Sequence, residues 1–245
     1  MFDFLKKLSR TTTNPPLPQV DMHAHLLPGI DDGAATMEDS LAMIEGMYDL
    51  GYRHLIATPH IYQEFYPNTT AIIQEKLQLV RQALTRKGLH IRLDAAAEYF
   101  LDDHFDKLLH QDDIMVLPGG YVLIEMSFVA EHPNFRQTLF DLQMKGYKPI
   151  LAHPERYPYL NQNILALENL VDGGCRLQLN LLSLLGHYGK GPQLAAERLL
   201  KHKLISMVGT DVHNIQHVDL LAQLHKSSAI RRLLKDYDFE NSKLV

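Results

Sequence analysis

Short apolar runs alternate with segments of helical periodicity along most of the chain. Most of these runs are bounded by Gly or Pro and are too short for helices, which is typical of strands buried on both faces of a parallel sheet. They predict seven strands, at residues 20–26, 54–60, 91–98, 121–127, 148–153, 176–180 and 204–211. Strands that alternate with crossover helices indicate an α/β fold with a parallel sheet.

The segments between the strands carry the helical patterns. Apolar residues recur at helical spacing from Met37 to Tyr48, with Thr36 as an N-cap and Gly51 as a stop. The same periodicity predicts further helices at residues 72–84, 134–145, 164–171 and 193–202.

Seven strands with crossover helices predict a distorted (β/α)7 barrel of the TIM type, and 245 residues suit one such domain. We expect the barrel to cover residues 20–245, after an N-terminal segment and Pro-rich linker at residues 1–19. The alternative is an open doubly wound sheet. Because no G-x-G-x-x-G sequence opens the first helix, the dinucleotide-binding version of that fold is disfavoured.

Composition excludes several classes of protein. A formal net charge of −5 disfavours a nucleic-acid-binding surface, and the absence of any apolar run of about 18 residues argues against stable membrane insertion. Cys175 is the only cysteine, so no internal disulfide can form and a cytoplasmic location is expected. A cysteine-based tyrosine phosphatase requires an arginine six residues after its cysteine, where this chain has Leu181.

Potential metal ligands lie at or just beyond the ends of most predicted strands. They are His23, His25, Asp32, His60, Glu98, Glu125, His153, Asp211 and His213. The carboxyl ends of parallel strands meet at one face of a barrel, so these side chains should converge there. Each of them alone is more often a surface or hydrogen-bonded residue, but their recurrence predicts a site for Mn, Zn or Fe.

Three further residues are candidates for binding a substrate. Arg156 follows His153 in a short loop, and its planar guanidinium matches phosphate oxygens, although a salt bridge to Glu155 is an alternative. Phe65 lies in an aromatic loop that could contact a phosphotyrosine ring, or that could simply pack on its own side chains. His217 follows the last predicted strand closely.

The ordered motifs resemble those of a known superfamily. Residues 21–33, DMHAHLLPGIDDG, are similar to the opening motif of the PHP (polymerase and histidinol phosphatase) superfamily. The form with Asp-Asp-Gly resembles the bacterial protein-tyrosine phosphatases encoded with capsule and exopolysaccharide genes. The later motifs follow in the expected order as Thr-Pro-His60, Glu98, Glu125, His-Pro-Glu-Arg156 and Asp211-Val-His-Asn.

The resemblance implies a trinuclear centre, often loaded with manganese, in which Glu98 bridges two ions. The implied ligand sets are His23, His25 and Asp211; Glu98, Glu125 and His153; and Asp32, His60 and His213. Because Asp-Gly is a common turn pair, we expect Asp31 to be a turn residue and Asp32 the ligand. Arg156 would hold the phosphate, with Asp211 and His213 as the other catalytic positions.

The implied activity is hydrolysis of phosphotyrosine, on a bacterial tyrosine kinase that controls polysaccharide export. The chain departs from the family pattern because no arginine occurs at residues 215–220, so phosphate binding could rely on Arg156, on His217 or on another loop. Alternatives are a small-molecule phosphatase of the histidinol-phosphate type and a non-catalytic metal-binding barrel. An amidohydrolase is disfavoured, since no lysine lies at the predicted strand ends.

Overall fold

The computed structural model describes residues 17–245, so residues 1–16 of the predicted N-terminal segment at residues 1–19 lie outside the described part of the chain. The strands in this part are all paired in parallel with their neighbours. Their bounds are β1 (Val20–Asp21), β2 (His54–Ala57), β3 (His60–Ile61), β4 (Arg92–Ala95), β5 (Glu98–Phe100), β6 (Tyr121–Glu125), β7 (Lys148–Ala152), β8 (Arg176–Asn180) and β9 (Met207–Gly209).

Two of the seven predicted strands are each broken into a pair. The second predicted strand becomes β2 and β3, separated at Thr58 and Pro59, and the third becomes β4 and β5, separated at Ala96 and Ala97. The breaks divide the hydrogen bonding into a sheet of order β1-β2-β4 and a sheet of order β3-β5-β6-β7-β8-β9. A proline in a central strand cannot donate a ladder hydrogen bond, which accounts for the first break.

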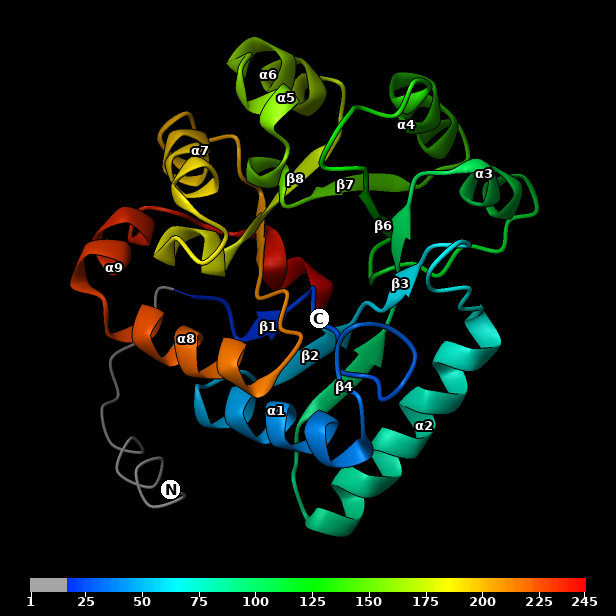
Figure 1. Ribbon diagram of the computed structural model, residues 1–245, viewed down its shortest axis with the longest axis vertical. Coiled ribbons are helices and arrows are strands. Elements are labelled where there is room, and N and C mark those ends of the chain that lie inside the picture. The colour runs from blue at the N-terminus through cyan, green and yellow to red at the C-terminus, as the bar shows by residue number, and fades with distance from the viewer. Residues whose placement is uncertain (1–16) are drawn as a thin grey trace.

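Backbone hydrogen bonds join the first strand to the last and close the ring. Beyond β1, Ala24 forms a parallel bridge with Val212, and the His25 amide donates to the Val212 carbonyl at 2.9 Å. The Asp211 amide donates to the His23 carbonyl at 2.8 Å. The seven strand positions thus form the predicted distorted barrel, with helices on its outside (Figure 1).

The five predicted helices are present, with ends that differ by a few residues. They are α1 (Met37–Asp49), α2 (Thr70–Lys87), α4 (Phe135–Met144), α6 (Ile164–Asp172) and α7 (Lys190–Lys201). The predicted N-cap is also present, since the Thr36 hydroxyl accepts from the Asp39 amide at 3.2 Å. Among the described residues, no helix is both long and apolar enough to cross a membrane.

Further helices are present that were not predicted. They are α3 (Asp103–His110), α5 (Pro158–Asn161), α8 (Ile215–Lys226) and α9 (Ser228–Leu234). α3 is a short helix of eight residues that buries Phe105 and Leu109, and the Asp102 side chain caps it by accepting from two backbone amides.

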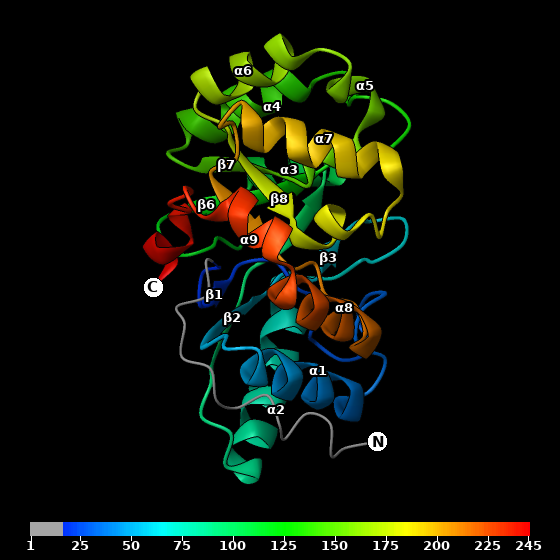
Figure 2. The same cartoon turned by 90° about the vertical axis from the view of Figure 1, so that its left-hand side faces the viewer.

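The chain returns near its end to the amino ends of the strands. The short helix η4 (Glu240–Leu244) packs against β1 and β9, and the C-terminus lies at the centre of the ring in Figure 1 and beside β1 in Figure 2. Leu244 is fully buried with the apolar side chains of the barrel interior. The Asn241 amide accepts from Val208 N at 3.0 Å and donates to the carbonyls of Val20 (3.1 Å) and Val208 (2.8 Å).

We expect Asn241→Ala to lower the free energy of unfolding by about 2 kcal/mol, because it leaves buried backbone groups of two strands without partners. Urea denaturation at constant metal concentration measures the change. Ser242→Ala is the matched control, since Ser242 is exposed. An unchanged denaturation midpoint in Asn241→Ala would mean that these hydrogen bonds contribute nothing to stability.

Candidate metal centre

The nine predicted ligands lie together at the carboxyl ends of the strands, and their nitrogen and oxygen atoms form overlapping groups within 4.8 Å. The first group is the most buried. The His23 Nε2 lies 3.1 Å from Glu98 Oε2 and 3.3 Å from Asp211 Oδ1. The His25 Nε2 lies 3.4 Å from each of the same two oxygens and 3.3 Å from the His23 Nε2.

Glu98 links this group to a second one. The His60 Nδ1 lies 3.2 Å from Glu98 Oε2 and 2.9 Å from Glu125 Oε1. On the other side of the carboxylate, the His153 Nε2 lies 3.0 Å from Glu98 Oε1 and 3.9 Å from Glu125 Oε2. The placement of Glu98 between histidines on different strands fits the predicted bridging position.

A third group lies toward solvent. The Asp32 Oδ1 is 3.5 Å from His60 Nε2 and 3.4 Å from His213 Nε2, and the His25 and His213 rings stack with centroids 3.9 Å apart. His60 therefore borders both the second and the third group. The expected division into three separate ligand sets is less sharp in the structure than the family resemblance implies.

Hydrogen bonds orient three of the histidines in the way that metal binding requires. The Nδ1 atoms of His23 and His25 lie 2.9 Å from Gln178 Oε1 and 2.8 Å from Asp31 Oδ2, and the Nδ1 of His213 lies 2.9 Å from the Asp211 carbonyl oxygen. Because these oxygens accept hydrogen bonds, each Nδ1 keeps its proton, and in the neutral ring the Nε2 that faces the cluster is the atom free to bind a metal ion.

The carboxylates also create a field that attracts cations. Burial lowers the pKa of the His23 imidazole, but the charges of Glu98 and Asp211 outweigh it and raise the pKa to about 9. Burial likewise opposes protonation of His60, and Glu98 raises its pKa to about 10. The buried Glu98 Oε2 makes no hydrogen bond of its own. The donor set therefore fits divalent cations, which would replace these protons.

Two of the cluster residues have backbone conformations that are unusual for side chains other than glycine. Asp211 has a φ of 51° and His153 a φ of 34°. A left-handed conformation of this kind costs roughly 1–2 kcal/mol per residue, so it is kept where the surroundings fix it. His153 directly follows β7 and Asp211 lies two residues after β9, and each turns its side chain into the cluster.

The three predicted substrate residues lie at different distances from the centre. Arg156 Nη1 donates to Asp211 Oδ2 at 3.2 Å, so the arginine is in direct contact with the cluster. His217 lies beside it, since its Nδ1 accepts from the His213 amide at 3.3 Å. Phe65 is 63% exposed and lies against Tyr62 with its ring tilted, whereas Tyr66 stacks on His60, with centroids 5.3 Å apart.

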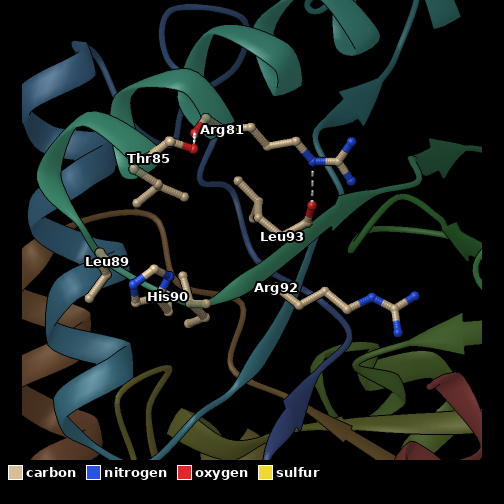
Figure 3. A pocket seen from close by; sticks show the side chains of 8 residues that line it. Arg81, Thr85, Leu89, His90, Arg92 and Leu93 are labelled. Carbon is tan, nitrogen blue, oxygen red and sulfur yellow. Dashed lines mark hydrogen bonds between the residues drawn. The ribbon is translucent and has the colours of Figure 1, made fainter.

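A separate cleft of about 380 Å³ lies at the amino end of β4, beside α2. Figure 3 shows the Arg81 side chain reaching from α2 to the Leu93 carbonyl, to which its Nε donates at 2.8 Å. Arg81 and Arg92 both pair with the Asp94 carboxylate, at 2.5 and 2.8 Å. These arginines are already engaged, and the cleft lies at the strand ends opposite the histidine cluster.

Comparison with known proteins identifies the family. The family described as "Capsular polysaccharide synthesis, CpsB/CapC" matches residues 19–236, which is most of the chain. The chain belongs to the CpsB/CapC family. The tyrosine-protein phosphatase YwqE of Bacillus subtilis is 32% identical over 224 residues, covering 90% of this chain and 86% of YwqE.

Solved structures extend the comparison to the fold. A chain from crystal structures of YwqE from Bacillus subtilis and CpsB from Streptococcus pneumoniae, described as metal-dependent tyrosine phosphatases, has a TM-score of 0.77 at 29% identity, covering 92% of this chain and 93% of that one. Histidinol phosphate phosphatase from Lactococcus lactis, at 15% identity, has a TM-score of 0.52 and covers 86% and 93%. The second likeness shows that the PHP fold is shared.

The CpsB/CapC-family site contains residues that the sequence analysis did not assign to it. Gln178 and Asn180 are polar residues two positions apart in β8, where polar and apolar residues alternate, so both side chains point the same way. That pattern could have revealed them. Asp31 forms the predicted turn, since its Oδ1 accepts from the Gly33 amide at 3.0 Å, but its other oxygen also orients His25.

Metal loading of this CpsB/CapC-family chain should release protons. With pKa values of about 9 and 10, His23 and His60 are protonated at neutral pH and must lose their protons to bind a metal ion. Apparent affinity for Mn²⁺ should therefore rise as the pH increases from about 6 to 9. Calorimetry in buffers of different ionisation enthalpy counts the protons, and a pH-independent affinity without proton release would contradict the prediction.

Proposed function

We propose that this chain is a metal-dependent protein-tyrosine phosphatase. The observation that carries the proposal is the Asp211 carboxylate, whose Oδ1 faces the histidines while its Oδ2 accepts from Arg156. A phosphate bound by the free edge of Arg156 lies against the cluster, where hydrolysis would occur. Similarity to YwqE over nearly the full length of both chains supports phosphotyrosine as the substrate.

The cluster would hold two or three divalent ions, of which Mn²⁺ is the foremost candidate and Fe or Zn the alternatives. Its ligands are imidazole nitrogens and carboxylate oxygens without a thiolate, a set that suits these metals. When bound, such ions supply Lewis acidity toward phosphoryl oxygens and lower the pKa of water toward neutrality.

Side chains at the rim would bind the phosphoryl group and the leaving oxygen. Arg156 donates to the phosphoryl oxygens and balances the charge that they carry in the transition state. His217 can donate without being charged. Burial and the neighbouring His213 and His187 lower its pKa, and because its Nδ1 accepts from the His213 amide, the proton of the neutral ring is on Nε2.

Aromatic side chains beside His60 would bind the tyrosyl ring. Tyr62 stacks on Phe100 with centroids 4.0 Å apart, and Phe65 lies against Tyr62 at 5.0 Å. Because Phe65 is exposed, its ring would be available to a substrate ring that approaches from solvent.

The physiological substrate would be a bacterial tyrosine kinase that controls capsular or exopolysaccharide synthesis. The family description and the names of the relatives support this assignment. It implies that the chain acts in the cytoplasm, where the kinase domain would present its phosphotyrosines. Residues 20–245 would form the complete phosphatase barrel, with residues 1–19 as a separate segment.

The first test is phosphate release from a phosphotyrosyl peptide, with manganese-reconstituted protein compared with chelator-treated protein. Release should require the metal, and histidinol phosphate assayed in parallel should yield little phosphate. Release from histidinol phosphate alone would support the metal-dependent mechanism but contradict phosphotyrosine as the substrate. No release from either substrate by metal-loaded protein would overturn the proposed activity.

Glu98→Gln should abolish the activity and lower the bound metal, because the neutral amide cannot balance the charge of two neighbouring cations. We expect a loss of at least about 100-fold in kcat/KM, with metal content measured by atomic emission. Glu131→Gln is the control, since Glu131 is an exposed loop residue. Wild-type activity at normal metal content in Glu98→Gln would refute the bridging role.

A further inference from the structure

The guanidinium of Arg156 is held against the faces of two aromatic rings. Its Cζ lies 4.4 Å from the ring centroid of Phe128 and 4.2 Å from that of Tyr188. Phe128 follows β6, whereas Tyr188 precedes α7, so segments about 60 residues apart in the chain meet at this arginine. A cation over an aromatic face is attracted by the negative face of the ring.

Each ring is fixed by contacts of its own. The Tyr188 hydroxyl accepts from Asn180 Nδ2 at 3.0 Å, and the same amide donates to Asp211 Oδ2 at 2.7 Å. Phe128 stacks on Tyr157, which is fully buried, with centroids 5.6 Å apart. The two rings are therefore parts of the framework around the centre and not loose side chains that happen to cover the arginine.

The remaining contact of Arg156 leaves donors free. Nη1 donates to Asp211 Oδ2, and this is its one hydrogen bond among the described residues. A guanidinium has five N–H donors in a fixed plane. Since the two rings occupy positions over the group and Asp211 takes one donor, the unused edge is available to an anion, and the side chain remains 22% exposed.

We propose that Phe128 and Tyr188 form an aromatic clamp, which positions Arg156 so that its free edge meets the phosphoryl group of the substrate. An unrestrained arginine loses rotamer freedom when it binds an anion, and a clamp that restrains it beforehand removes that loss. Both are positioning residues that act through Arg156. The inference rests on the proposed function, because it takes Arg156 as the phosphate-binding residue.

Phe128 could also bind the substrate directly, and that role predicts different experimental results from the clamp. Phe128 is 42% exposed, so its ring could instead contact the tyrosyl ring of a substrate. Inorganic phosphate distinguishes the two roles, since it binds where the phosphoryl group binds but has no ring. Its binding to the manganese-loaded full chain also requires no turnover.

The experiment measures the affinity of inorganic phosphate by calorimetry for Phe128→Leu and Tyr188→Leu. Each should bind phosphate roughly tenfold more weakly than wild type at unchanged metal content. Phe128→Tyr keeps the ring and should retain affinity. Val129→Ala is the control, because Val129 is the adjacent residue and is 89% exposed. In an Arg156→Lys background, Phe128→Leu should have no further effect, since the planar group is gone.

Unchanged phosphate affinity in both leucine variants would overturn the clamp. An equal loss of phosphate affinity in the Arg156→Lys background would indicate a structural effect and would also overturn it. A higher KM for phosphotyrosyl peptide in Phe128→Leu, with normal phosphate binding, would overturn it as well. If the leucine variants lose phosphate affinity as expected while the wild type hydrolyses no phosphotyrosyl peptide, the clamp stands and only the proposed function fails.

Discussion

The buried carboxylate of Glu98 is the group on which the rest of the site depends. Its Oε2 faces His23, His25 and His60, while its Oε1 faces His153. An ionised carboxylate with no exposure to water is unfavourable unless opposite charge surrounds it. The histidines, and the ions that they would hold, provide that charge. Glu98 thus requires the strands that carry them to end close together.

The broken strands of the barrel bring these ends together. The interruptions at Pro59 and at Ala96 and Ala97 separate β2 and β4 from the short strands β3 and β5, which begin with His60 and Glu98. Left-handed backbone conformations at His153 and Asp211 likewise turn these two side chains into the cluster.

The sequence alone predicted the seven strand positions and all nine residues of the cluster, because metal ligands are polar residues at the ends of apolar runs. It did not predict residues whose role depends on neighbours distant in the chain. Phe128 and Tyr188 have ordinary local patterns, and only tertiary structure places them beside Arg156. The alternation in β8 marks Gln178 as a candidate, but only tertiary structure places it beside His23. The sequence indicated Phe65 as a residue that could contact a substrate ring, whereas the structure places Tyr66 against His60.

The parallel bridge between Ala24 and Val212 joins the two ends of the barrel, so it determines when the metal centre can assemble during synthesis. His23 and His25 leave the ribosome early, but the cluster lacks Asp211 and His213 until nearly 190 more residues have been made. Until then the first strand has no partner on one side, and its histidines form only part of a binding site. Contacts of such large sequence separation form late in folding. A nascent chain therefore cannot assemble the complete centre, and full metal loading must follow ring closure.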